Sequence, residues 1–158
     1  MDKNIYLDHN ATSPLLPEVQ TAMNEAAEKS LGNPSSPHWA GREAKILLEE
    51  ARNSLAKSLG TEPREIIFTS GGSESNNAVL RQLSVASGKQ HLITSTIEHP
   101  SVLETCRILA TKPNIELTEL PVDSSGLIDP DSLKKCISSQ TSLISLMTAN
   151  NEDRKSVV

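Results

Sequence analysis

Residues 68–77, which read Phe-Thr-Ser-Gly-Gly-Ser-Glu-Ser-Asn-Asn, have the composition of an anion-binding turn. The β-branched and aromatic residues just before the glycines predict a buried strand over residues 65–69. The two glycines allow the backbone to approach a ligand closely, and Ser73 and Glu74 suit the first turn of a helix. Backbone N–H groups at a helix start favour phosphate, because the helix dipole adds partial positive charge there. Since such turns also serve only to redirect the chain, the motif alone leaves both roles open.

Other polar residues that could do chemistry follow two later predicted strands. His99 comes after a predicted strand at residues 91–95, and residues 150–152 (Asn-Asn-Glu) come after one at residues 142–147. Ligands gather at the carboxyl ends of parallel strands, so these residues are expected at the same sheet edge as the glycine turn. By itself His99 also fits a surface histidine before a helix, and Asn151 also fits a turn or helix cap.

The elements that must position these residues are predicted from apolar spacing and from glycine and proline. Two helices precede the turn, one at about residues 17–31 before Gly32 and one at about residues 44–59 before Gly60. Strands and helices then alternate: strands 65–69, 91–95, 115–120 and 142–147, and helices to about residue 86, at 100–110 and at 129–137. This alternation predicts an α/β fold with a mostly parallel sheet flanked by helices.

Composition narrows the function classes. The chain has 158 residues and a net charge of -5, which suits one domain with a core and argues against a nucleic-acid or anionic-membrane surface. With one Trp, one Tyr and one Phe, the core must be aliphatic and a base-stacking platform is not expected. We also expect no membrane partner and a cytoplasmic location, because neither a membrane span nor a targeting segment is recognisable.

The two cysteines, Cys106 and Cys136, have neither CxxC spacing nor a neighbouring histidine. The sequence therefore predicts no disulfide framework and no metal site. Both cysteines fall at apolar positions of predicted helices, so buried structural thiols are expected.

Five segments in order resemble one enzyme family: residues 6–14 (Tyr-Leu-Asp-His-Asn-Ala-Thr-Ser-Pro), 32–36 (Gly-Asn-Pro-Ser-Ser), 68–77, 98–99 (Glu-His) and 150–152. They resemble the N-terminal part of cysteine desulfurases and selenocysteine lyases, which are pyridoxal-phosphate (PLP) enzymes of the class V aminotransferase branch. The resemblance covers residues 4–152 and implies part of the large domain of a fold-type I PLP-dependent transferase. It also implies a homodimer, L-cysteine or L-selenocysteine as substrate, L-alanine as product, and a sulfur or selenium acceptor protein as a further partner.

The resemblance implies roles for individual residues. Gly72 and Ser73 match the positions that bind the cofactor phosphate, by backbone amide and by amide plus hydroxyl. His99 matches the histidine that stacks on the pyridine ring and is proposed to help move protons. Asn151 matches the asparagine that hydrogen-bonds the phenolic oxygen of the cofactor.

A second set of implied contacts lies near the N-terminus. Asn10, Ala11 and Thr12 match a loop near the substrate, although His9 stands where relatives commonly have Tyr. These three residues are expected to bind substrate.

The family's Schiff-base lysine, its aspartate that pairs with the pyridine nitrogen and its reactive cysteine all follow the asparagine motif in relatives, and none is assigned here. We therefore expect residues 1–152 to be the N-terminal part of a class V aminotransferase domain, which by itself is inactive. Residues 153–158 depart from the family and match the translation of a common sequencing adapter, so we expect a foreign tail. A splice variant with a short alternative end is the rival explanation.

Three functions follow as hypotheses. The leading one is PLP-dependent removal of sulfur or selenium by the intact parent protein, with the cytosolic-looking start and residues 70–77 favouring the selenocysteine lyase side. A class V aminotransferase with another substrate also fits, because the cofactor turn does not name the substrate. A truncated protein could also act as a non-catalytic binding or dimerisation module.

Overall fold

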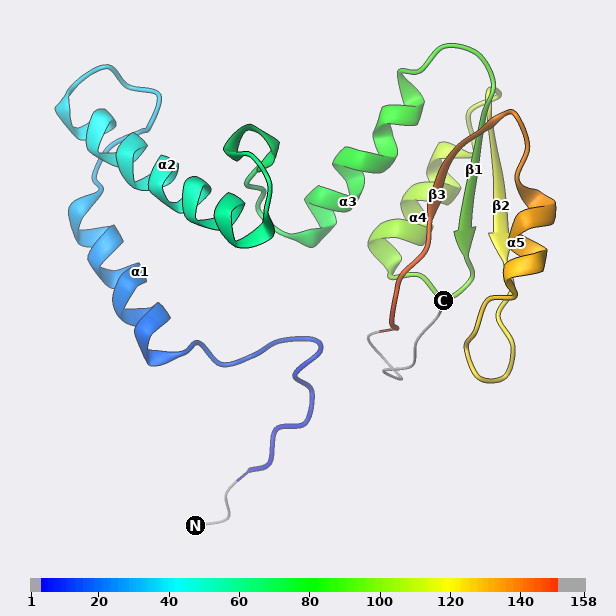
Figure 1. Cartoon of the computed structure of the whole chain (residues 1–158), viewed down its shortest axis with the longest axis horizontal. Helices are drawn as coiled ribbons and strands as arrows, with labels where there is room; N and C mark the ends of the chain where they lie inside the picture. Colours follow the sequence, from blue (N-terminus) through cyan, green and yellow to red (C-terminus); the bar gives the residue numbers. More distant parts are fainter. Residues whose placement is uncertain (1–3, 151–158) are drawn as a thin grey trace. The chain divides into compact units, whose positions relative to one another are not determined.

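The structure is a computed structural model that describes residues 4–150 (Figure 1). Two compact units meet in sequence between Phe68 and Thr69, and each is considered by itself. Within the described range, no helix has the length and apolar character that crossing a membrane requires.

The first unit is helical. It contains α1 (Pro17–Lys29), α2 (Trp39–Leu59) and the short 3-10 helix η1 (Pro63–Glu65). The predicted stop after the second helix is confirmed, because Gly60 takes the left-handed conformation (φ 68°) that ends helices at low steric cost. The side chain of His38 caps the start of α2 by accepting a hydrogen bond from a backbone N–H of the first turn.

The predicted strand at residues 65–69 is wrong. Residues 66–69 join no sheet, and the side chains of Ile67 and Phe68 are 82% and 45% exposed. Instead, the Arg52 guanidinium donates a hydrogen bond to the carbonyl of Ile66 and lies 4.9 Å from the centroid of the Phe68 ring. The apolar run reports a strand propensity, but a strand forms only where a neighbouring strand supplies its hydrogen bonds.

The second unit is the predicted α/β arrangement. Its elements are α3 (Gly72–Leu80), η2 (Arg81–Ser84), β1 (Gln90–Ser95), α4 (Pro100–Leu109), β2 (Ile115–Leu120), α5 (Pro130–Cys136) and β3 (Thr141–Ser145). The strands form a parallel sheet in the order β2-β1-β3, with β1 in the centre. The strand positions predicted for these three segments are confirmed. The helix predicted to reach about residue 86 is shorter, because its α-helical part ends at Leu80 and tightens into η2.

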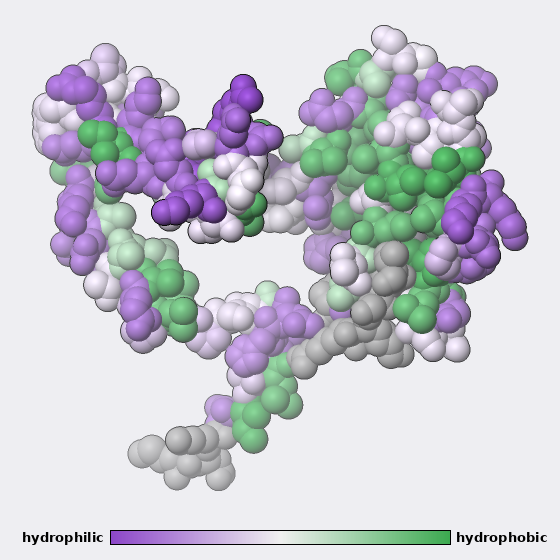
Figure 2. All heavy atoms as spheres, in the orientation of Figure 1, coloured by the Kyte–Doolittle hydropathy of each residue, from purple (hydrophilic) through white to green (hydrophobic). Residues whose placement is uncertain are grey.

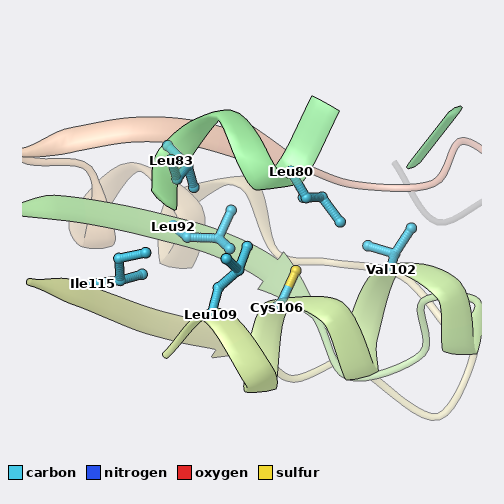
Figure 3. Close-up of a cluster of buried hydrophobic side chains, with 7 residues drawn as sticks. All are labelled: Leu80, Leu83, Leu92, Val102, Cys106, Leu109 and Ile115. Carbon is cyan, nitrogen blue, oxygen red and sulfur yellow. The ribbon is translucent and has the colours of Figure 1, made fainter. Parts of the chain in front are cut away.

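Successive residues of β1 face opposite sides of the sheet, and each side has its own apolar cluster. Leu92 packs against residues of α3, η2, α4 and β2 (Figure 3), namely Leu80, Leu83, Val102, Cys106, Leu109 and Ile115. Ile93 packs on the other side with Leu120 and Ile128, and Leu133 of α5 lies against that cluster. Helices therefore cover both faces of the sheet, and the core is aliphatic as predicted.

The prediction of buried structural thiols is confirmed for Cys106. This side chain is completely buried, and desolvation raises the pKa of its thiol to about 11. Cys136 is only partly buried at the edge of the second cluster, because it is the last residue of α5. A thiol with a raised pKa is a poor nucleophile, so Cys106 has a packing role.

Candidate active site

The glycine turn opens directly into α3. Gly71 is the N-cap and Gly72 the first helical residue, and a Cβ atom added at either glycine would meet no atom within 4 Å. As at any helix start, the first N–H groups have no acceptor within the helix, and those of Gly72 and Ser73 reach none elsewhere in the described chain. The hydroxyl of Ser73 is likewise without a hydrogen bond to a described residue. Two amides and one hydroxyl are thus without an acceptor in the described chain, and their binding of a phosphate stays a prediction.

The backbone N–H and the hydroxyl of Ser70, just before the two glycines, already donate hydrogen bonds within the turn. The Glu74 carboxylate accepts hydrogen bonds from the backbone N–H and from the hydroxyl of Ser70, both at 2.7 Å. Both bonds lower the pKa of the Glu74 carboxyl below its ordinary value, and the bond from the Ser70 hydroxyl contributes most. Across the same turn, the hydroxyls of Thr69 and Ser75 lie 2.8 Å apart. The turn is therefore braced by its own side chains, which leaves the donors of Gly72 and Ser73 for a ligand.

His99 is the N-cap of α4, at the carboxyl end of β1. Its Nδ1 accepts a hydrogen bond from the backbone N–H of Ser101 at 3.0 Å and lies 2.8 Å from the Ser101 hydroxyl. The ring is exposed, and Nε2 bonds to nothing among residues 4–150. One ring nitrogen, Nδ1, thus has the structural role of capping α4, while the other, Nε2, is available to a ligand.

Two side-chain contacts join the middle of α3 to α4. Asn76 Nδ2 donates to the Ser101 hydroxyl oxygen at 2.8 Å, and the Thr105 hydroxyl donates to Asn77 Oδ1 at 3.2 Å. Residues three apart share a helix face, so Ser73 and Asn76 lie on the same side of α3. Because Ser101 follows His99 by two positions, its contact with Asn76 brings the face of α3 that carries Ser73 toward the start of α4. The strand-end argument predicted the place of His99, but it does not account for the turn, whose preceding strand is not formed.

The segment after β3 is held at the same edge. The buried Glu98 carboxylate accepts hydrogen bonds from the Ser95 hydroxyl at 2.7 Å and from the Met147 N–H at 2.8 Å. Asn150 Nδ2 donates to the carbonyl of Ile97 at 3.0 Å. These bonds bind residues 147–150 to the loop that carries His99. Asn151 lies outside the described residues, so its predicted contact with a cofactor stays a prediction.

The predicted substrate residues belong to the first unit. Asn10, Ala11 and Thr12 lie in an exposed turn in which the N–H groups of Ala11 and Thr12 donate to the carbonyl of Asp8 at 3.2 and 3.3 Å. His9 packs edge-on against the ring of Tyr6, with centroids 5.0 Å apart. The binding role of this turn also stays a prediction.

Sequence reasoning assigned no role to three residues of the site, Asn76, Ser101 and Glu98, although Asn76 and Glu98 lie in segments that carried the resemblance. A carboxylate directly after a buried strand and before His99 was a signal for Glu98 that could have been used. Asn76 and Ser101 carry no such signal, because each is an ordinary polar residue of a helix and only their contact makes them informative.

Comparisons with known proteins agree with this architecture. The family model for aminotransferase class-V matches residues 5–153. The chain is 50% identical over 155 residues to the cysteine desulfurase IscS of Dictyoglomus turgidum, covering 96% of the chain, and 39% identical over 171 residues to the human selenocysteine lyase, also covering 96%. A solved structure of a NifS-like protein superposes with a TM-score of 0.86 at 38% identity, covering 95% of the chain and 41% of that protein.

The chain spans about two fifths of the curated relatives it matches, 39% of the D. turgidum protein and 38% of the human protein. The family match nevertheless includes nearly every described residue of both units. The open glycine turn and His99 both lie in the segments that carried the resemblance, and both lie within the family match. The chain belongs to the aminotransferase class-V family, where its homologues include cysteine desulfurases and a selenocysteine lyase.

Proposed function

We propose that the full-length protein containing this chain is a PLP-dependent enzyme that removes sulfur or selenium from L-cysteine or L-selenocysteine and releases L-alanine. The observation that carries the proposal is the open start of α3, with two free amides and the Ser73 hydroxyl, joined to His99 through Asn76 and Ser101. The names of the relatives supply the substrates.

The residues present fit the cofactor. A phosphate group needs several donors and positive potential, and the amides of Gly72 and Ser73 offer both at the α3 N-terminus. The open space beside both glycines leaves room for the group. PLP, when bound, supplies an electron sink for the carbanion that remains after the substrate loses its α-proton.

Each predicted site residue then has a definite task. Gly72 and Ser73 bind the phosphate and fix its position, and the exposed ring of His99 stacks against the cofactor and takes part in proton movement. Asn151 contacts the phenolic oxygen, and Asn10, Ala11 and Thr12 contact the substrate. A homodimer, a sulfur or selenium acceptor protein and a cytoplasmic location belong to the same proposal.

Both substrates have support among the relatives. The 50% identity to a cysteine desulfurase exceeds the 39% identity to a selenocysteine lyase, which favours cysteine. Steady-state kinetics of the full-length protein with each amino acid would decide between them, with L-alanine as the common product.

The proposal is tested by reconstituting the purified full-length protein with PLP. We expect visible absorption from bound PLP and release of L-alanine from cysteine or selenocysteine. The 158-residue chain is the matched control, and we expect it to show no covalently bound PLP and no turnover. Full-length protein that stays colourless after reconstitution would overturn the proposal.

A further inference from the structure

The cap of α4 determines which nitrogen of His99 carries a proton. The backbone N–H of Ser101 points at Nδ1 from 3.0 Å, and a backbone N–H can only donate. Nδ1 must therefore present its lone pair. A neutral imidazole has one proton, so that proton is on Nε2.

The Ser101 hydroxyl reinforces this arrangement. Asn76 Nδ2 donates to the hydroxyl oxygen at 2.8 Å, and the same oxygen lies 2.8 Å from His99 Nδ1. The hydroxyl hydrogen is left to point at Nδ1, which forms a chain of donors from Asn76 through Ser101 to His99. Asn76 and Ser101 are both partly buried, which shields these bonds from competing water.

We propose that Ser101, supported by Asn76, is a positioning residue that holds His99 as the Nε2–H tautomer. His99 then presents a hydrogen-bond donor, not a lone pair, to the ligand at this edge of the sheet. The inference rests on the proposed function only for the identity of that ligand, PLP with its amino-acid substrate.

The tautomer narrows what His99 can do. An Nε2 that already carries hydrogen has no lone pair with which to accept the α-proton of the substrate. Nδ1 could accept a proton only by giving up the hydrogen bond from the Ser101 N–H and by reversing its bond with the Ser101 hydroxyl. The proton movement open to His99 is therefore donation of its Nε2 proton to the stacked ligand, and another group takes the α-proton.

Three variants isolate the contribution of Ser101. Ser101→Ala removes the hydroxyl but keeps the backbone cap, and Ser101→Thr restores a hydroxyl. Ser132→Ala is the matched control, because Ser132 in the first turn of α5 makes the equivalent bonds to its own N-cap, Asp129, from its N–H at 3.2 Å and its hydroxyl at 2.7 Å. The control loses a comparable cap contact in another helix.

The direct measurement is imidazole ¹⁵N NMR of the full-length protein without PLP, with the His99 signals assigned from a His99→Gln sample. We expect a pyridine-type Nδ1 and a pyrrole-type Nε2. In Ser101→Ala the Nδ1 resonance should move toward that of an unbonded pyridine-type nitrogen, Ser101→Thr should restore it, and Ser132→Ala should leave it unchanged. A pyrrole-type Nδ1 in the parent protein, or an unmoved Nδ1 in Ser101→Ala, would overturn the inference.

The loaded enzyme gives a second readout. Loss of one hydrogen bond predicts that Ser101→Ala lowers kcat about fivefold to tenfold with KM unchanged, and that Ser101→Thr recovers it. An unchanged kcat overturns the positioning role. The two proposals can fail separately. If the full-length protein stays colourless with PLP but shows the expected ¹⁵N shifts, the PLP function is overturned while the positioning of His99 by Ser101 is retained.

Discussion

At the scale of single residues, His99 combines a structural and a chemical task in one ring. Nδ1 caps α4 and Nε2 is left at the exposed edge. A substitution at this position therefore changes helix stability and ligand contact together unless the two are separated by design.

The pair His99→Ala and His99→Asn separates them. In the full-length protein both should lower turnover by a factor of about 10², because both remove the ring. Asn is a good N-cap, so only His99→Ala should also lose roughly 1 kcal/mol of stability. Steady-state kinetics and thermal unfolding measure the two effects, and near-normal turnover in His99→Asn would exclude the ring from the reaction.

Ser73 offers a test of the phosphate site. A hydrogen bond to a charged group contributes roughly 1.5 to 3 kcal/mol, so Ser73→Ala should weaken PLP affinity about tenfold to hundredfold. Ser73→Thr keeps a hydroxyl and serves as the control. Equilibrium titration of the full-length protein with PLP measures the effect, and equal affinities for Ser73→Ala and the parent would remove Ser73 from the site.

At the scale of elements, the carboxyl edge of the sheet is assembled by Glu98. One of its carboxylate oxygens accepts hydrogen bonds from the end of β1 and from the residue that follows β3 by two positions. The carboxylate thereby links the ends of β1 and β3 beyond the last backbone pairing of the two strands.

Removing this carboxylate should be costly. Glu98→Ala leaves the Ser95 hydroxyl and the Met147 N–H without their acceptor, and unsatisfied buried donors cost roughly 1 to 3 kcal/mol. Glu116→Ala on β2 is the matched control, because Glu116 is exposed. Chemical denaturation of the full-length variants measures the difference, and similar losses in both would contradict the bracing role.

The N-cap of α5 predicts a dependence of stability on pH. Hydrogen bonds from the Ser132 hydroxyl and then from the Asp131 N–H lower the pKa of Asp129 below its ordinary value of 3.8. A lowered folded-state pKa means that the stabilisation is complete above the ordinary value and is lost as the pH falls through the lowered one.

Asp129→Asn keeps an oxygen that can cap the helix but cannot titrate. As the pH is lowered from about 4, the Tm of the full-length parent should fall more steeply than that of Asp129→Asn, while the two curves run parallel near neutral pH. Thermal unfolding monitored by circular dichroism at several pH values provides the comparison. Parallel curves across the acid range would show that Asp129 does not contribute in this way.

At the scale of the whole chain, the distribution of exposed apolar side chains bears on association. Figure 2 shows hydrophobic residues gathered over the part of the second unit that contains β3, where Ile144 is 39% exposed. In the described sheet β3 is an edge strand, and exposed apolar edges favour association between chains.

We therefore expect the isolated 158-residue chain to self-associate as its concentration rises. Ile144→Lys should reduce this association, because it places a charge on the exposed face of the edge strand. Ser142→Lys adds the same charge on the same face without removing an apolar side chain, and should reduce association less. Sedimentation velocity distinguishes the cases, and a monodisperse monomer of the unsubstituted chain would contradict the expectation.

The sequence by itself determined the alternation of elements, the parallel sheet and the residues at its carboxyl edge. These depend on local causes, such as apolar spacing, the left-handed stop at Gly60 and the cap of a helix by a polar residue before it. The types of Gly72, Ser73 and His99 were sufficient to propose a ligand site, and its occupancy stays a prediction. The strand predicted at residues 65–69 fails, because local pattern does not reveal whether a partner strand is present.

Only the tertiary structure decided how those residues act together. Asn76 and Ser101 are 25 positions apart, and Glu98 and Met147 are 49 apart, so their contacts arise from parallel crossovers that bring distant strand ends to one edge. The tautomer of His99 depends on a backbone N–H whose direction is set by the first turn of α4. Residue types limit which hydrogen bonds are possible, but the packing of helices on the sheet determines which of them form.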